Sequence, residues 1–214
     1  MVLRRSTLPN IITVGRIVMA PAVMYLMFIP TFTARILSWL LFLIAAFSDL
    51  WDGYLARKHG WISNFGKLVD PIADKLLLAC TFVPFYLISH RPGAQNELPL
   101  IGQLPMWVVL IVFGREIFIT AVRSFAANRG LVIPAARAGK QKAVFQNIFA
   151  GVTIFWYALQ SAAINHGWSG ELWANWQILH GWLFLTSLAL AVLLTVYSMV
   201  VYLIAWRKLA HSVP

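Results

Sequence analysis

Six stretches of mostly apolar residues, separated by short polar segments, dominate this 214-residue chain. They run over residues 9–30, 34–56, 69–90, 103–126, 140–163 and 178–206. Because about 20 apolar residues in a helix cross the hydrocarbon core of a bilayer, each stretch predicts a transmembrane helix. The first stretch contains Arg16 and Pro21, so we expect an N-terminal interfacial segment. The pattern predicts an all-α integral membrane protein with six transmembrane helices, in a single domain over residues 1–214.

Composition supports this prediction. Hydrophobic residues make up 60% of the chain and charged residues 11%, whereas soluble domains are roughly 45–50% apolar and about 25% charged. A disordered chain and an ordinary soluble domain are therefore excluded. The single cysteine excludes a disulfide framework. No small-residue cleavage site follows the first apolar stretch, so we expect no removable signal peptide.

The charge distribution indicates the orientation of the helices. The chain has 17 Lys and Arg against 7 Asp and Glu, a net charge of +10. If the N-terminus is inside, the inner segments hold most of the basic residues and the outer segments hold only Arg35 and Arg91. Because basic residues gather in cytoplasmic loops, we expect both termini to be cytoplasmic. The net positive charge is then explained by the cytoplasmic loops and by the binding of phosphate groups, and it does not indicate nucleic-acid binding.

The outer segment after the fifth stretch is rich in tryptophan, with Trp168, Trp173, Trp176 and Trp182. Tryptophan is enriched where a membrane meets water. We expect this segment to anchor the protein at the interface, with a short helix lying on the membrane.

Four of the acidic residues fall at helical spacings near the predicted inner ends of the second and third helices. Asp49, Asp52, Gly53 and Ala56 share one stripe of the second helix, and Asp70 and Asp74 share one face of the third. The four carboxylates are predicted to converge below the cytoplasmic surface. Carboxylate oxygen ligands without Cys or His favour Mg²⁺, Mn²⁺ or Ca²⁺ over zinc, and Mg²⁺ or Mn²⁺ is the expected cofactor. The alternative is a set of intramembrane acids paired with bases such as Lys75 or Arg115.

These positions form the pattern D-x2-D-G-x2-A-R-x8-G-x3-D-x3-D. It is filled by Asp49, Asp52, Gly53, Ala56, Arg57, Gly66, Asp70 and Asp74. The pattern resembles the signature of the CDP-alcohol phosphotransferases, membrane enzymes that make phospholipids. The resemblance implies six transmembrane helices, a homodimer and a cytoplasmic divalent-metal site. It also implies the reaction, in which an alcohol attacks the β-phosphate of a CDP-linked donor and CMP leaves.

The resemblance further implies roles for single residues. The four aspartates would hold the metal, two divalent ions being suited to an in-line displacement, and Asp74 would be the general base. The residues expected to contact the CDP group are Asp49, Asp52, Gly53, Ala56, Arg57, Gly66 and Asp70, with Asn10 and Thr13 from the N-terminal segment. That segment, with Arg16, is placed to close over the nucleotide. The equally open alternative is an interfacial helix cap with a snorkelling arginine.

Basic residues on the fourth and fifth stretches indicate a second anionic site. Arg115 and Arg123 lie about two helical turns apart and share a face, and Lys140 and Lys142 open the fifth stretch. Cations beside a carboxylate cluster suit a phosphorylated acceptor. Two alternatives stay open: Arg123 and the lysines could reflect topology alone, and Arg115 could pair with Glu116 or with a cluster carboxylate.

Further segments resemble the phosphatidylglycerophosphate synthase branch of this family, namely residues 8–16, Arg115-Glu116-Ile117 and Gly139-Lys140-Gln141-Lys142. This implies CDP-diacylglycerol as donor, sn-glycerol 3-phosphate as acceptor, and the inner membrane of a bacterial cell, with the active site facing the cytoplasm. Ala143 departs from the branch, where a Thr is expected. Phosphatidylinositol phosphate, cardiolipin and phosphatidylserine synthases are the alternatives within the family. A small divalent-cation transporter is the alternative from another class.

Overall fold

A computed structural model describes residues 8–59, 64–129 and 137–211. Its six long helices are α1 (Leu8–Met27), α2 (Phe32–His59), α3 (Asn64–Ser89), α4 (Met106–Asn128), α5 (Arg137–His166) and α6 (Glu171–His211). The connection between α3 and α4 contains a short 3₁₀ helix, η2 (Ala94–Asn96). Every apolar stretch identified in the sequence therefore forms a helix, and the described residues have an all-α fold.

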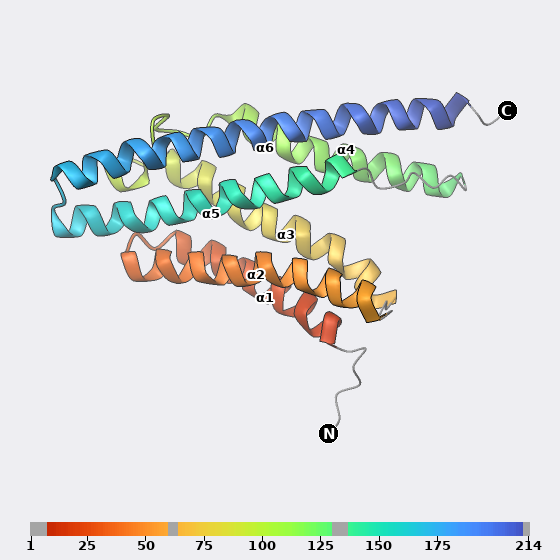
Figure 1. The fold of residues 1–214 in the computed structure, drawn as a ribbon, viewed down its shortest axis with the longest axis horizontal. Helices are drawn as coiled ribbons and strands as arrows, with labels where there is room; N and C mark the ends of the chain where they lie inside the picture. Colours follow the sequence, from red (N-terminus) through yellow and green to blue (C-terminus); the bar gives the residue numbers. More distant parts are fainter. Residues whose placement is uncertain (1–7, 60–63, 130–136, 212–214) are drawn as a thin grey trace, which may run out of the picture.

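The helices run back and forth along one direction (Figure 1). The helix α1 packs against α2 and α3, α5 packs against α2 and α6, and α4 packs against α6. Because successive helices run in opposite directions, α1, α3 and α5 begin at the same end of the molecule, where α2, α4 and α6 finish. The opposite end holds η2 and the connections between α1 and α2 and between α5 and α6.

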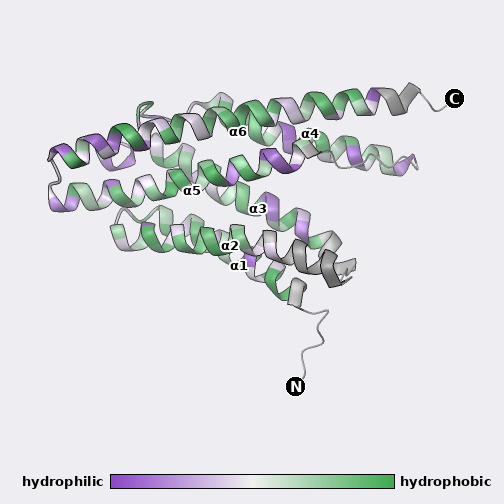
Figure 2. Ribbon diagram, in the orientation of Figure 1, coloured by the Kyte–Doolittle hydropathy of each residue, from purple (hydrophilic) through white to green (hydrophobic). Residues whose placement is uncertain are grey.

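Aromatic side chains fill the centre of the bundle. Phe82, Phe85, Phe149 and Phe184 are fully buried, with neighbouring ring centroids 5.3–5.8 Å apart. Hydrophobic residues cover the middle of the helices, and hydrophilic residues gather toward the two ends (Figure 2). Large apolar side chains also face outward from several helices. A surface of this kind suits contact with lipid.

Within the residues that the structure describes, four helices are long and apolar enough to cross a membrane. They are α1 over Asn10–Met27, α3 over Val69–Ser89, α5 over Ala138–His166 and α6 over Glu171–Arg207. The apolar part of α2 is shorter, Phe32–Ser48, and α4 carries Arg115, Glu116 and Arg123. The all-helical membrane-type architecture is thus confirmed, while six spans and cytoplasmic termini stay predictions.

The expected separate interfacial helix after the fifth stretch is not observed, and that prediction is wrong. Trp173, Trp176 and Trp182 belong to α6, which begins at Glu171, before the predicted start at residue 178. Contacts with α5 explain the early start. The rings of Trp156 and Trp173 stack with centroids 6.3 Å apart, and His180 Nε2 lies 3.1 Å from the carbonyl oxygen of Val152.

Arg35 fastens the connection between α3 and α4 at the end that holds η2. Its side chain is only 1% exposed. Nη1 donates to the carbonyl oxygens of Gln95 (2.9 Å) and Tyr157 (3.2 Å) and to Ser161 Oγ (2.8 Å), and Nη2 donates to Asn96 Oδ1 (3.3 Å). The guanidinium also lies over the Tyr157 ring, 5.1 Å from its centroid. One buried cation therefore joins α2, η2 and α5.

Candidate active site

A cavity of about 510 Å³ lies toward the end at which α1, α3 and α5 begin, as its lining residues and the helix bounds show. Residues from all six helices line it, including Arg16 of α1 and Ala46 of α2. Its other charged and polar lining residues are Asp70, Asp74, Lys75, Arg115, Glu116, Thr120, Arg123, Ser124, Lys140, Lys142, Gln146, Asn147, Ser198 and Tyr202. The cavity therefore brings together two sets of residues that the sequence analysis placed in separate sites. Asp70 and Asp74 belong to the predicted metal and donor site, and the four basic residues belong to the predicted acceptor-phosphate site.

Asp70 and Asp74 form the acidic wall. They are one turn apart on α3, and their side chains are 48% and 58% exposed. Because α1 packs against α3, α1 supplies their partners. Thr13 Oγ1 donates to Asp70 Oδ1 (2.7 Å), and Arg16 Nη1 donates to Asp74 Oδ1 (2.9 Å). These contacts hold both carboxylates at the cavity surface.

Arg16 is fully buried, with 1% of its surface exposed. Its Nη2 also lies 3.7 Å from Asp70 Oδ1, so one guanidinium faces both carboxylates. A snorkelling arginine would keep its charge in water, and the burial excludes that alternative for Arg16. Asn10 and Thr13 lie inside α1, which begins at Leu8, so Thr13 is not a helix cap. In the sequence, Arg16 stands out as a candidate site residue because it is an arginine within an otherwise apolar helix.

The remaining motif residues lie at the end of α2 and the start of α3. These are Asp49, Asp52, Gly53, Ala56, Arg57 and Gly66, whose side chains lie outside the described residues. The convergence of four carboxylates therefore stays a prediction. Among the side chains that are described, no group of three or more His, Cys, Asp or Glu could hold a metal ion.

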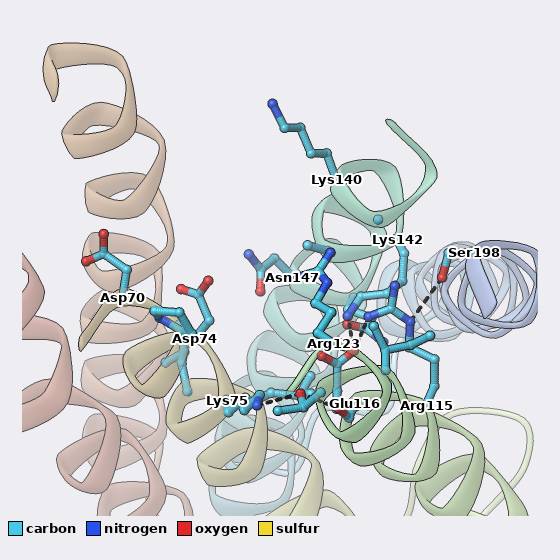
Figure 3. Close-up of a pocket in the computed structure, with 18 of the residues that line it drawn as sticks. Asp70, Asp74, Lys75, Arg115, Glu116, Arg123, Lys140, Lys142, Asn147 and Ser198 are labelled. Atoms are coloured by element: carbon cyan, nitrogen blue, oxygen red, sulfur yellow. Dashed lines mark hydrogen bonds and ion pairs between the residues drawn. The ribbon is translucent and has the colours of Figure 1, made fainter. Parts of the chain in front are cut away.

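The opposite wall is basic (Figure 3). Arg115 Nη1 donates to Glu116 Oε1 (3.0 Å), and Lys142 Nζ donates to the same oxygen. Of the alternatives left open by the sequence, the pairing of Arg115 with Glu116 is the one observed. Glu116 thereby links α4 to α5. Lys140 extends from the first turns of α5 away from the other cations.

Two hydroxyl groups of α6 complete the basic wall. Arg115 Nε donates to Ser198 Oγ (3.2 Å), and Arg123 Nε donates to Tyr202 Oη (3.0 Å). Sequence reasoning missed Ser198 and Tyr202. Their only signal is a polar group within a very apolar helix, and such hydroxyls commonly bond to their own backbone.

Other polar side chains complete the lining. Lys75 Nζ donates to Thr120 Oγ1 (2.7 Å) and so connects α3 to α4 (Figure 3). Asn147 of α5 points into the space between the two walls. Ala143, which departs from the expected Thr, also lines the cavity. Asn147 was not predicted from the sequence.

The chemistry of the two walls is complementary. Half-exposed carboxylate oxygens are the donor type that Mg²⁺ and Mn²⁺ prefer, so Asp70 and Asp74 fit a hard divalent cation. Arginine and lysine side chains bind phosphate oxygens. A cavity with both kinds of wall suits a phosphate-bearing ligand together with a divalent ion.

Comparison with known proteins identifies the class. The family model for CDP-alcohol phosphatidyltransferase matches residues 6–193, so the chain belongs to this family of membrane phospholipid enzymes. The resemblance found in the sequence motif is thereby confirmed. Membership favours an enzyme over the cation transporter.

Individual relatives are more specific. The chain is 33% identical over 149 residues to the CDP-diacylglycerol–glycerol-3-phosphate 3-phosphatidyltransferase of Rickettsia typhi, covering 70% of this chain and 76% of the relative. It is 33% identical over 141 residues to the Rickettsia bellii protein of the same name, covering 66% and 71%. It is 34% identical over 170 residues to an Arabidopsis thaliana chloroplastic/mitochondrial enzyme of that name, numbered 1, covering 76% and 53%.

Proposed function

We propose that this protein transfers a phosphatidyl group from CDP-diacylglycerol to sn-glycerol 3-phosphate. The acceptor hydroxyl oxygen bonds to the β-phosphorus, the bond from that phosphorus to the bridging oxygen breaks, and CMP leaves. The product is phosphatidylglycerophosphate. The observation that carries this proposal is a cavity lined both by Asp70 and Asp74 and by four basic residues, Arg115, Arg123, Lys140 and Lys142. Family membership and the names of the relatives support it.

The donor site is built around the motif. Asp49, Asp52, Asp70 and Asp74 would hold Mg²⁺ or Mn²⁺, in our proposal two ions, and these would neutralise the diphosphate and improve CMP as a leaving group. The cytidine diphosphate would contact Asp49, Asp52, Gly53, Ala56, Arg57, Gly66 and Asp70. From α1, Asn10 and Thr13 would contribute. The Thr13–Asp70 hydrogen bond supports a shared role for α1 and α3.

Asp74 is our candidate general base. A carboxylate beside the acceptor hydroxyl accepts its proton as the hydroxyl oxygen attacks phosphorus. The hydrogen bond from Arg16 orients the Asp74 carboxylate. Phosphoryl transfer mainly requires correct positioning and compensation of charge. Asp74 and Arg16 would contribute to both.

The acceptor site is the basic wall. Arg115, Arg123, Lys140 and Lys142 would bind the phosphate of glycerol 3-phosphate. All four line the cavity that Asp74 borders. A phosphate held there leaves the glycerol hydroxyl on the side of the carboxylates.

We extend the proposal to the setting of the enzyme. The helices would make six spans in a bacterial inner membrane, with both termini and the cavity on the cytoplasmic side, and two chains would form a homodimer. The position of the cavity, at the end where α1 begins and α6 finishes, supports this orientation.

The test is CMP release by purified protein in lipid–detergent micelles with CDP-diacylglycerol and either Mg²⁺ or Mn²⁺. The acceptor panel is sn-glycerol 3-phosphate, glycerol, serine, inositol phosphate and phosphatidylglycerol. We expect release with glycerol 3-phosphate, and none when the metal is removed with EDTA. Release with another member of the panel but not with glycerol 3-phosphate would refute the proposed acceptor.

A further inference from the structure

We propose that Ser198 and Tyr202 of α6 are positioning residues that aim Arg115 and Arg123 at the phosphate of the acceptor. This inference rests on the proposed function, since it concerns how the acceptor site works. The two α6 residues follow residue 193, where the match to the family model ends. They therefore lie outside the part of the chain that the family model matches.

The geometry of the two contacts is the same. In each, the Nε–H of an arginine on α4 donates to a buried hydroxyl on α6: Arg115 to Ser198 at 3.2 Å and Arg123 to Tyr202 at 3.0 Å. Ser198 and Tyr202 are each 2% exposed. They are four residues apart and so share one face of α6, which packs against α4.

An anchor at Nε sets the direction of the whole guanidinium. The group is planar and rigid, so a hydrogen bond from Nε fixes where its two Nη nitrogens point. Phosphate recognition by arginine depends on this direction, because the favoured contact is bidentate. Arg123 needs the anchor most, since its side chain is exposed in the cavity. The Tyr202 ring adds a second constraint, with the guanidinium carbon 5.3 Å from its centroid.

The choice of a hydroxyl as the anchor also matters. A carboxylate partner would orient an arginine but would cancel its charge, whereas a neutral hydroxyl orients it and leaves the charge for the ligand. Ser198 is itself held in place, because its Oγ donates to the carbonyl oxygen of Thr195 (2.9 Å) and accepts from Arg115. Arg123, whose printed hydrogen bond goes to the Tyr202 hydroxyl, thus keeps its charge for the ligand, whereas Arg115 is oriented by Ser198 and also pairs with Glu116.

The chain offers a matched control for each substitution. Tyr202→Phe removes the hydroxyl and keeps the ring, and its control is Tyr197→Phe on the same helix, where the side chain is 55% exposed. Ser198→Ala has Ser187→Ala as its control. Ser187 is also buried in α6, and its Oγ makes the same kind of bond, to the carbonyl oxygen of Phe184 (2.9 Å).

The experiment measures steady-state CMP release for the four variants. We expect Tyr202→Phe and Ser198→Ala each to raise the KM for sn-glycerol 3-phosphate about threefold to tenfold, the size expected for the loss of one typical hydrogen bond. The KM for CDP-diacylglycerol should stay unchanged, and so should both constants in the controls. Equal increases for both substrates, or no increase beyond the controls, would overturn the inference.

A binding measurement separates positioning from folding. Without donor, sn-glycerol 3-phosphate should raise the melting temperature of the wild-type protein and of Tyr197→Phe, and should raise that of Tyr202→Phe much less at the same concentration. A rise in the melting temperature of Tyr202→Phe as large as that of the wild type would contradict the inference. If the wild type uses a different phosphorylated acceptor, the proposed function fails in that respect. The same measurements with that acceptor then decide the role of α6 separately.

Discussion

Two arginines of this protein are buried to the same extent at opposite ends of the bundle, and they have different partners. Arg16 and Arg35 are each 1% exposed. Arg16 faces the carboxylates of Asp70 and Asp74 at the cavity. Arg35 donates to carbonyl, amide and hydroxyl oxygens of α5 and of the η2 connection. The first contact orients groups that a ligand can reach, whereas the second joins parts of the fold.

The physical reason for the difference lies in how a buried charge is compensated. Arginine stays protonated in proteins, so each site must supply acceptors. Neutral oxygens around Arg35 accept hydrogen bonds from its two Nη nitrogens and have no further chemistry to perform. The carboxylates beside Arg16 are half-exposed and keep oxygen atoms available to the cavity. We therefore expect substitutions at the Arg16 end to change activity and those at the Arg35 end to change stability.

Asp74→Asn should produce the largest effect. The amide cannot accept the proton of the acceptor hydroxyl, so we expect CMP release to fall by about 10²- to 10⁴-fold. The melting temperature should change little, because the side chain is 58% exposed and the amide keeps an oxygen for Arg16. Activity close to that of the wild type would show that Asp74 is not the base.

Arg16→Gln tests the partner of that carboxylate. We expect kcat to fall about 10- to 100-fold, the size typical of residues that orient metal-binding groups. The matched substitution is Arg35→Gln, which removes an equally buried arginine at the other end. A similar loss of kcat in both variants would mean that Arg16 acts on the fold and not on the carboxylates.

Arg35→Gln should instead lower the free energy of unfolding, by about 2–3 kcal/mol, because it leaves buried acceptors without a charged donor. The folded fraction of the Arg35→Gln protein should keep the wild-type kcat and KM values. Reversible unfolding in detergent gives the first quantity and CMP release gives the others. A changed KM for either substrate would break the proposed separation between the two ends.

The sequence predicted the helices well because long apolar runs depend only on the chain itself. All six runs became helices, with bounds that differ by a few residues. The largest difference is the start of α6, since its Trp-rich first turns resemble an interfacial segment until α5 is seen beside them. The motif and the basic residues also pointed to one end of the bundle. Asp70, Asp74, Arg115 and Lys142 do line one cavity.

Contacts between helices could not be predicted in the same way. Hydropathy does not tell a buried Arg16 from one that reaches the membrane surface, because both are arginines in an apolar helix. The signal from Ser198, a polar group in an apolar helix, was equally ambiguous. Its bond to the carbonyl oxygen of Thr195 is one that a membrane helix makes alone, and only the approach of α4 adds Arg115 as a second partner.

The smallest expected effect comes from single hydroxyl groups at the two ends. Thr13→Val removes the donor to Asp70 Oδ1, and we expect kcat to fall about threefold with stability nearly unchanged. Ser161→Ala removes an acceptor of Arg35 Nη1, and we expect a loss of about 1 kcal/mol in the free energy of unfolding with kcat unchanged. CMP release and unfolding in detergent, measured on both variants, check the pair. A reversal, in which Thr13→Val changes stability alone and Ser161→Ala changes kcat, would show that the division between the two ends does not extend to their neutral partners.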